Sequence, residues 1–519
     1  MIGGLVEREG RHGRSRPFAN AVGMVFGALL LLAAGPGFAE AGRTLPSTVI
    51  APLAAGDEPI VVTTHRVLTA HGLLSYEARA GRILIRNEET GEIHGRIFFV
   101  SYTVPPSRSK RPIFFAWNGG PTVPSNLINM EGFGPRRLTG QGMVDNAETL
   151  LAESDLVFFD PIETGFSRPE KPEFAPEFLN MKGDVATTAE FIRAYRARFG
   201  AEEQPLFVGG ESYGAFRAAA VSDFLSQRGV KLAGTILISG DIPNIPMPIP
   251  FYNAMHVPAR TATAFHYHKL PPELMKDRDA TLRQVNDWVT SQYMPALTNI
   301  EHLSDAEREA IAQSLARYTG LSPDHIDRRT LVVGVNDYRA EFFGGDGTRT
   351  LAGLDTRILQ SGPSYYARGD QVDEYLRGEL GYSTDLAYSP FEKGYMPTPG
   401  PLRRPNYRQW LYNQDGVTPE TVAAVAADGE VTLLARSNPP WIVDAMRREP
   451  DLRVFVATGR FDPLNMCEGD VAATATLESS LSARIINRCY EGGHVMYRDE
   501  PVRVQMSREL AEFIHLAAR

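Results

Sequence analysis

The stretch FVGGESYGAFR, residues 207–217, decides the fold of this chain. Its apolar start predicts a strand, its Gly-Glu-Ser-Tyr-Gly centre a tight turn, and the small residues that follow at 218–221 a helix. This order is the context of a G-x-S-x-G nucleophile elbow, in which a strained turn exposes a serine hydroxyl at a helix N-terminus. The partial positive charge of that terminus favours a developing anion. The competing interpretation is an ordinary strand-to-helix turn with a surface serine, but the flanking residues favour Ser212 as a nucleophile.

Apolar runs on both sides of this elbow predict a mostly parallel sheet. They span residues 113–117, 156–160, 235–239 and 454–458. Strands that are apolar throughout are buried on both faces, and helical stretches between them complete an α/β pattern. Residues 60–104 instead form short or alternating runs with a turn at 87–91, which predicts an antiparallel meander. We therefore expect an α/β-hydrolase fold, with an antiparallel N-terminal meander and a mostly parallel central sheet.

The α/β pattern stops between about residues 243 and 405. A capping box from Ser304 to Glu307 opens a helix in this stretch that ends near Gly320. Because strands resume at Arg453, an inserted, largely helical cap is favoured over a separate C-terminal domain. The predicted division is a signal peptide at 1–39, a first part of the hydrolase domain at 45–242, the cap at 243–405 and a second part at 406–519, with an extended linker at 45–57.

The composition is that of a globular protein and argues against a nucleic-acid partner. The 519 residues are 43% hydrophobic and 22% charged, and their formal net charge is -9. A nucleic-acid-binding domain would carry a basic patch, and no basic block follows the N-terminus. No second long apolar run follows the N-terminus either, so we expect no stable membrane insertion of the mature chain; its oligomeric state is left open.

The N-terminus has the order of a secretory signal. Arginines precede an apolar run at 21–34, and small residues follow at 37–39. The run is shorter than the roughly 20 residues that a membrane span needs, so a signal peptide is favoured over a membrane anchor. We expect an exported protein, periplasmic or secreted. Export would allow Cys467 and Cys489 to oxidise, and the sequence leaves a single disulfide and two buried thiols as open alternatives.

An elbow serine needs a base and an orienting acid, which follow the serine in the order acid, then base. Asp462 lies in a predicted turn after the apolar run at 454–458, and His494 follows two glycines after a strand-like run at 484–490. Alone, each would be an ordinary turn or loop residue. Together with Ser212 they stand in the required order at the ends of strands. We predict that His494 removes the Ser212 proton and that Asp462 orients and stabilises the imidazolium.

The oxyanion of the tetrahedral intermediate needs two hydrogen-bond donors. One is the backbone N–H of the residue after the nucleophile, which is Tyr213. The second comes from an earlier strand-to-helix loop, and the sequence Asn118-Gly119-Gly120 is well placed to supply it, with Gly120 as the predicted donor.

These motifs resemble those of the serine carboxypeptidase family of α/β-hydrolases. The block N-G-G-P at 118–121 is similar to the family's own block, and G-E-S-Y at 210–213 resembles its nucleophile box. Residues 161–167, 459–462 and 493–494 resemble further family motifs, whereas the cap matches nothing that we can align. The resemblance implies that Asn118 and Glu211 bind the terminal carboxylate of a peptide substrate. Glu211 would have to hold a proton there, because two carboxylates repel each other.

Several positions depart from the family pattern. The family continues N-G-G-P with Gly-Cys-Ser-Ser, whereas this chain has Thr-Val-Pro-Ser at 122–125. The glutamate of the family's E-x-G-P motif is displaced by one position, which leaves Glu131 as a weaker candidate for carboxylate binding. The competing interpretation of Glu211 is an acidic residue that stabilises a helix N-terminus.

The predicted activity is that of an exported serine carboxypeptidase acting on peptides through an acyl-enzyme. An esterase or acyltransferase with the same triad is the first alternative, and a non-catalytic binding protein of this fold is the second. No cofactor and no metal are expected, because the chain has no H-E-x-x-H motif, and His266 and His268 are expected on the surface of the cap.

Overall fold

The computed structural model describes residues 48–50, 56–105, 111–240, 247–345, 347–360, 369–389 and 440–519, all within one compact unit, Arg43–Arg519. The predicted signal peptide at 1–39 lies outside the described residues. Within the described ranges, no helix has the length and apolar character that crossing a membrane requires.

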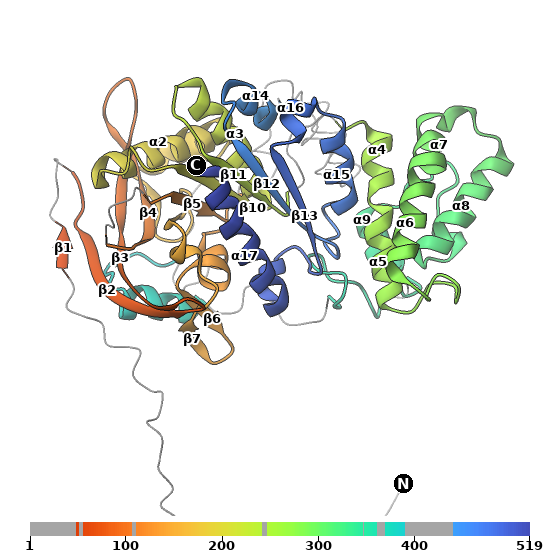
Figure 1. Ribbon diagram of the computed structural model, residues 1–519, viewed down its shortest axis with the longest axis horizontal. Helices are drawn as coiled ribbons and strands as arrows, with labels where there is room; N and C mark the ends of the chain where they lie inside the picture. The colour runs from red at the N-terminus through yellow and green to blue at the C-terminus, as the bar shows by residue number, and fades with distance from the viewer. Residues whose placement is uncertain are drawn as a thin grey trace, which may run out of the picture. The chain divides into compact units, whose positions relative to one another are not determined.

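One large mixed sheet forms the centre of the structure (Figure 1). Its strand order is β1-β2-β3-β4-β8-β5-β10-β11-β12-β13, with β9 paired to β4. The antiparallel part consists of β1 (Thr48–Ile50), β2 (Ile60–Thr69), β3 (Gly72–Arg86), β4 (Ile93–Thr103) and β9 (Arg168–Pro169). The parallel part consists of β8 (Asp155–Phe159), β5 (Ile113–Trp117), β10 (Leu206–Glu211), β11 (Gly234–Ile238), β12 (Arg453–Gly459) and β13 (Ile485–Tyr490). The predicted meander and parallel strands are confirmed.

Two details of the meander differ from the prediction. The expected linker at 45–57 contains β1, which pairs antiparallel with β2. The strand β3 runs without a break through Gly81, where the sequence indicated two short segments. A Cβ atom at Gly81 would lie 2.4 Å from Cδ1 of Ile60, so the glycine allows β2 to pack close to β3.

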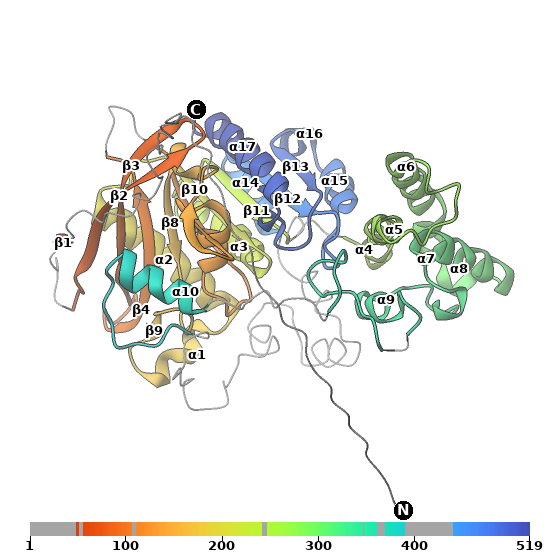
Figure 2. The ribbon, with the colours of Figure 1, turned by 90° about the horizontal axis from the view of Figure 1, so that it is seen from below.

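Helices cover both faces of the sheet. Successive residues of each strand point to opposite faces, and the central strands carry apolar side chains on both, so each face packs against helices. Ile113, Phe115 and Trp117 of β5 pack on one face with α2 (Met181–Phe199), α3 (Tyr213–Gln227) and α14 (Trp441–Arg448). Phe114 and Ala116 pack on the other face with α17 (Glu500–Ala517). Figure 2 shows α17 and α3 separated by the sheet. Shorter elements complete this part: β6 (Arg136–Thr139), β7 (Gly142–Asp145), α1 (Ala175–Phe178), α15 (Cys467–Ala475) and α16 (Ser479–Ser482).

A long insertion separates β11 from β12, and its described residues form two groups. The first group has its own hydrophobic core and contains α4 (Ile249–Met255), α5 (Val257–His266), α6 (Arg278–Trp288), α7 (Met294–Thr298), α8 (Asp305–Thr319) and α9 (Val335–Glu341). The capping box at Ser304 and the left-handed Gly320 bound α8 as predicted. The second group, α10 (Gly369–Asp373) and the π-helical turn Glu374–Glu379, packs on the sheet through Val372, Tyr375 and Leu376. The domain boundaries remain a prediction.

Candidate active site

Ser212 lies between the end of β10 and the start of α3, in the tight turn that the sequence indicated. Its backbone has φ 61° and ψ -130°, a conformation that non-glycine residues rarely adopt and that marks a strained turn. The Ser212 N–H donates to the carbonyl oxygen of Ile238, 2.8 Å away, which holds the turn to β11. The flanking glycine Gly210 is required by packing, because a Cβ atom there would lie 2.3 Å from the carbonyl oxygen of Gly214.

The Asn-Gly-Gly-Pro loop that follows β5 lies directly against this turn. A Cβ atom at Gly119 would lie 2.6 Å from the backbone nitrogen of Tyr213, so only glycine allows the loop to approach so closely. Gly120 has φ 107°, in the region that favours glycine. The loop that carries Gly120 and the elbow that carries Tyr213 are therefore in contact, and both predicted oxyanion donors belong to this contact.

A buried ion pair holds the loop and the helix together. Arg217, one turn into α3 and fully buried, donates from Nε to Oδ2 of Asp184 at 2.7 Å. Its Nη1 donates to the carbonyl oxygen of Asn118 at 2.9 Å, and its Nη2 to that of Pro121 at 3.3 Å. One guanidinium thus fixes both ends of the Asn-Gly-Gly-Pro loop to the helix that begins at the nucleophile.

Asp462 and His494 form a hydrogen-bonded pair at the ends of β12 and β13. His494 Nδ1 lies 2.7 Å from Oδ2 of Asp462, and both side chains are buried. Asp462 also accepts from the N–H of Leu464 at 2.9 Å and from Nδ2 of Asn465 at 2.6 Å. With these donors around the carboxylate, Nδ1 of His494 carries the proton and Nε2 is left to accept one.

The charge around His494 favours its protonated form. Burial lowers the pKa of this imidazole, but the charge and hydrogen bond of Asp462 and the charge of Glu211 raise it, and the net shift is upward. An imidazolium formed during the reaction would therefore be stabilised where it forms.

The nucleophile and the base are linked through β11. Ser212 bonds to Ile238, and the next residue, Ser239, donates from its hydroxyl to the carbonyl oxygen of His494 at 2.6 Å. Asn465 donates to the carbonyl oxygen of Ser239 at 2.9 Å. The end of β11 therefore contacts the elbow, the acid loop and the base loop together.

A short segment of the insertion, residues 354–357, binds both the acid loop and the base loop. The His494 N–H donates to the carbonyl oxygen of Leu354 at 2.6 Å, and the Thr356 N–H donates to that of Phe461 at 3.0 Å. Arg357 bonds to Asp355 and to Asp499, which opens α17. We call residues 354–357 the strap.

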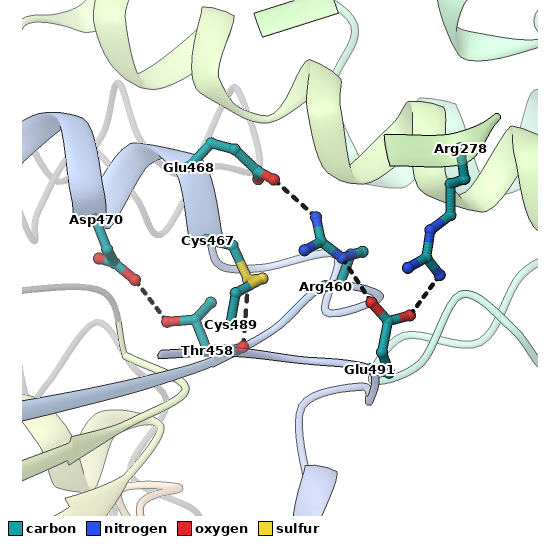
Figure 3. Close-up of a disulfide and its surroundings, with 8 residues drawn as sticks. All are labelled: Arg278, Thr458, Arg460, Cys467, Glu468, Asp470, Cys489 and Glu491. Carbon is teal, nitrogen blue, oxygen red and sulfur yellow. Dashed lines mark hydrogen bonds and ion pairs between the residues drawn. A yellow bond between two sulfur atoms is a disulfide. The ribbon is translucent and has the colours of Figure 1, made fainter. Parts of the chain in front are cut away.

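A disulfide joins the segments next to these two loops, since Cys467 begins α15 after the acid loop and Cys489 lies in β13 before the base loop. Cys467 lies five positions after Asp462 and Cys489 five positions before His494, and the two cysteines are bonded, which decides the open alternative. Figure 3 shows this disulfide beside an ion-pair chain from Arg278 through Glu491 to Arg460. Because Arg278 begins α6, this chain connects the base loop to the first helical group of the insertion.

Asn118 and Glu211 meet beside the elbow. Nδ2 of Asn118 donates to Oε2 of Glu211 at 3.3 Å, and Oδ1 of Asn118 accepts from the N–H of Ile128 at 3.0 Å. The hydroxyl of Tyr497, three residues after His494, donates to the same oxygen of Glu211. Burial raises the pKa of Glu211 above its ordinary value, against the lowering effects of His494, Tyr497 and Arg498. The structure thus brings together the two residues that the resemblance assigned to carboxylate binding, and it favours a protonated Glu211.

Glu131 lies near this pair but binds a different partner. It belongs to the π-helical segment Ile128–Phe133, and both of its oxygens accept from Arg498, with Nη2 at 3.0 Å from Oε1. Both side chains are partly exposed, 18% for Glu131 and 23% for Arg498. Glu131 also raises the pKa of Glu211 through its charge.

Sequence reasoning missed several residues of this site, namely Asn465, Tyr497, Arg498, Ser239 and the Arg217–Asp184 pair. Tyr497 and Arg498 directly follow the base on one short loop, so the nearness in sequence was a usable signal. Arg217 also stood in the deciding stretch, as a cation inside a helix otherwise lined by small residues. Its partner, 33 positions away, had no such signal.

Comparisons with known proteins agree with these motifs. Residues 77–237 match the family model described as serine carboxypeptidase. A search of curated proteins finds no match. Among solved structures, the Kex1 carboxypeptidase of Saccharomyces cerevisiae, described as prohormone-processing, is 14% identical over 85% of this chain and 91% of that chain, with a TM-score of 0.44. Proline iminopeptidase of Mycobacterium smegmatis is 13% identical over 85% and 98%, with a TM-score of 0.35.

The strand order and the elbow described above establish the α/β-hydrolase fold. The match over 77–237 contains the Asn-Gly-Gly-Pro loop and the elbow, which are the motifs that carried the predicted resemblance. The chain is therefore a hydrolase with the α/β-hydrolase fold, and within residues 77–237 it is similar to the serine carboxypeptidases.

Proposed function

We propose that this protein is an exported serine carboxypeptidase that removes the C-terminal residue of peptides through an acyl-enzyme on Ser212. The observation that carries the proposal is the buried pair of Asn118 and Glu211 beside the elbow. An amide donor and a carboxyl group with a raised pKa can both donate hydrogen bonds to a carboxylate. A plain ester pocket would have no use for them, because it would bind no terminal carboxylate.

The proposed reaction uses each residue at a stated atom. His494 Nε2 accepts the hydroxyl proton of Ser212 as the serine oxygen attacks the carbonyl carbon of the last peptide bond. The N–H groups of Gly120 and Tyr213 stabilise the oxyanion. His494 then protonates the leaving amine, and the C-terminal residue departs with its carboxylate. Water attacks the acyl-enzyme with His494 again as the base, which restores Ser212.

Export is part of the proposal. It rests on the order of basic, apolar and small residues at 1–39. The disulfide between Cys467 and Cys489 supports it, because structural disulfides persist in oxidising compartments. Cell fractionation with detection of the mature N-terminus tests this part separately; full-length protein in the cytoplasm would contradict it.

Matched substrates test the activity. N-blocked dipeptides with free and with amidated C-termini are compared with an ester of the same acyl group, using Ser212→Ala as the control. We expect cleavage of the free-acid peptide at a much higher kcat/KM than the amide, and no cleavage by Ser212→Ala. Equal cleavage of free and amidated peptides would contradict carboxypeptidase activity, and cleavage of the ester alone would favour the esterase or acyltransferase alternative.

A further inference from the structure

The loop that carries the base also brings a cation to the carboxylate-binding residues. Arg498 ends the helical turn Met496–Arg498, four positions after His494 and directly after Tyr497. Because the Tyr497 hydroxyl bonds to Glu211, this loop is fixed next to the proposed carboxylate site. The charges of Arg498 and Glu131 both act on Glu211, in opposite directions. Arg498 therefore belongs to the surroundings of that site.

Two segments far apart in sequence meet at this cation. Glu131, its carboxylate partner, lies in the segment Ile128–Phe133, whose first N–H also fixes the side chain of Asn118. The segment that orients Asn118 thus also holds Arg498, and Asn118, Glu211 and Arg498 form one connected group. The Glu131–Arg498 pair is partly exposed at 18% and 23%, whereas Asn118 and Glu211 are buried at 1% and 4%. Arg498 is therefore more accessible to solvent than Asn118 and Glu211.

We propose that Arg498 is a second recognition residue for the substrate's terminal carboxylate, shared between that carboxylate and Glu131. This proposal rests on the proposed function. A guanidinium has several N–H donors in a planar arrangement, so one arginine can bind two carboxylates at once. This chain uses that arrangement elsewhere, since Arg357 binds Asp355 and Asp499 together, and Arg460 binds Glu468 and Glu491.

The chemistry of the site explains why a fixed cation is useful. Without one, a substrate carboxylate would depend on a protonated Glu211, and its binding would weaken wherever Glu211 ionises. An arginine stays charged throughout the working pH range. Glu131 orients the guanidinium and offsets part of its charge, so that the empty site does not hold an uncompensated cation.

Substitutions of Arg498 and of Glu131 test the proposal because we expect them to change substrate preference in opposite directions. In Arg498→Met, we expect the kcat/KM ratio of free-acid peptide to matched ester to fall about 10- to 100-fold, the loss typical of a hydrogen bond to a charged group. In Glu131→Gln, measured at acidic pH where Glu211 is protonated, we expect the ratio to rise, because the guanidinium charge is no longer offset. Arg498→Lys should recover part of the ratio through its charge.

A control on the strap, next to this loop, separates recognition from structural support. Arg357→Met removes a neighbouring ion pair between the strap and Asp499, and should lower kcat/KM for peptide and ester alike. If Arg498→Met also lowers both substrates equally, Arg498 is a structural residue and the proposal is wrong. That result, an unchanged kcat/KM ratio of peptide to ester, would leave the proposed function intact. A wild-type enzyme that shows no preference for free-acid peptides would overturn both.

Discussion

The nucleophile half and the acid–base half of the site are held in different ways. The elbow and the Asn-Gly-Gly-Pro loop are fixed by glycine contacts and by the buried Arg217, all within the matched range 77–237. The loops of Asp462 and His494 are fixed by a disulfide and by the strap at 354–357, which the insertion supplies. The first half is thus positioned by its own motif. The second depends on contacts between segments that are distant in sequence, so changes in the insertion can reach the base.

The largest expected effect comes from the acid. Asp462→Asn keeps the shape of the side chain but no longer fixes the tautomer of His494, so we expect kcat to fall about 10⁴-fold. The measurement is kcat on the ester substrate. Asp470→Asn is the matched control, since Asp470 is a buried carboxylate of the same half that bonds to Thr458. Equal losses in both variants would contradict the role assigned to Asp462.

The buried ion pair tests the nucleophile half. Arg217→Met leaves Asp184 buried without its guanidinium, and breaking such a pair costs about 3–5 kcal/mol of unfolding free energy. We also expect kcat to fall up to about 10²-fold, because the loop that carries a predicted oxyanion donor loses two of its hydrogen bonds. Denaturant unfolding and ester kinetics measure these effects.

The double variant Asp184→Asn/Arg217→Met is the control for that change. It removes the buried charge as well, so it should regain part of the lost stability but not the lost rate. A double variant as unstable as Arg217→Met alone would show that the ion pair is not the cause.

The disulfide tests the acid–base half. Cys467→Ala/Cys489→Ala should lower the free energy of unfolding by about 2–4 kcal/mol, as expected for a crosslink of this loop length, with a sequence separation of 22. Because the crosslink ties α15, which follows the acid loop, to β13, which leads into the base loop, we expect kcat to fall as well. Wild-type protein treated with a reductant should behave in the same way. If the free energy of unfolding and kcat are unchanged in the double variant and in the reduced wild-type protein, the disulfide does not hold the acid–base half in place.

The smallest expected effect is a change of substrate preference with pH. His494 has a raised pKa and must be neutral to act as base, so activity on the ester should rise as pH increases through that pKa. Glu211 also has a raised pKa and donates to a carboxylate only while protonated, so binding of free-acid peptide should weaken as pH increases through it. The kcat/KM ratio of free-acid peptide to ester should therefore fall with increasing pH, and a ratio that rises would contradict the role of Glu211.

The sequence alone predicted the elbow turn and the sheet class, because each depends on a local pattern. It also placed Asp462 and His494 after the ends of strands, and their roles as acid and base stay predictions. It did not predict the edge strand β1, which has only three residues and little burial to distinguish it from a linker. It did not predict the partner of Glu131 either, because Arg498 lies 367 positions away. Nor could it predict the strap. The backbone bonds of Leu354 and Thr356 to the base and acid loops carry no sequence signal, and Asp499, a partner of Arg357, lies 142 positions away.

The most direct test of the account is covalent labelling by an active-site-directed fluorophosphonate, followed by mass spectrometry. We expect one adduct, on Ser212 within residues 207–217, which forms much more slowly in His494→Ala and Asp462→Asn. An adduct on a different serine, or labelling of Ser212 at the wild-type rate in His494→Ala, would contradict it.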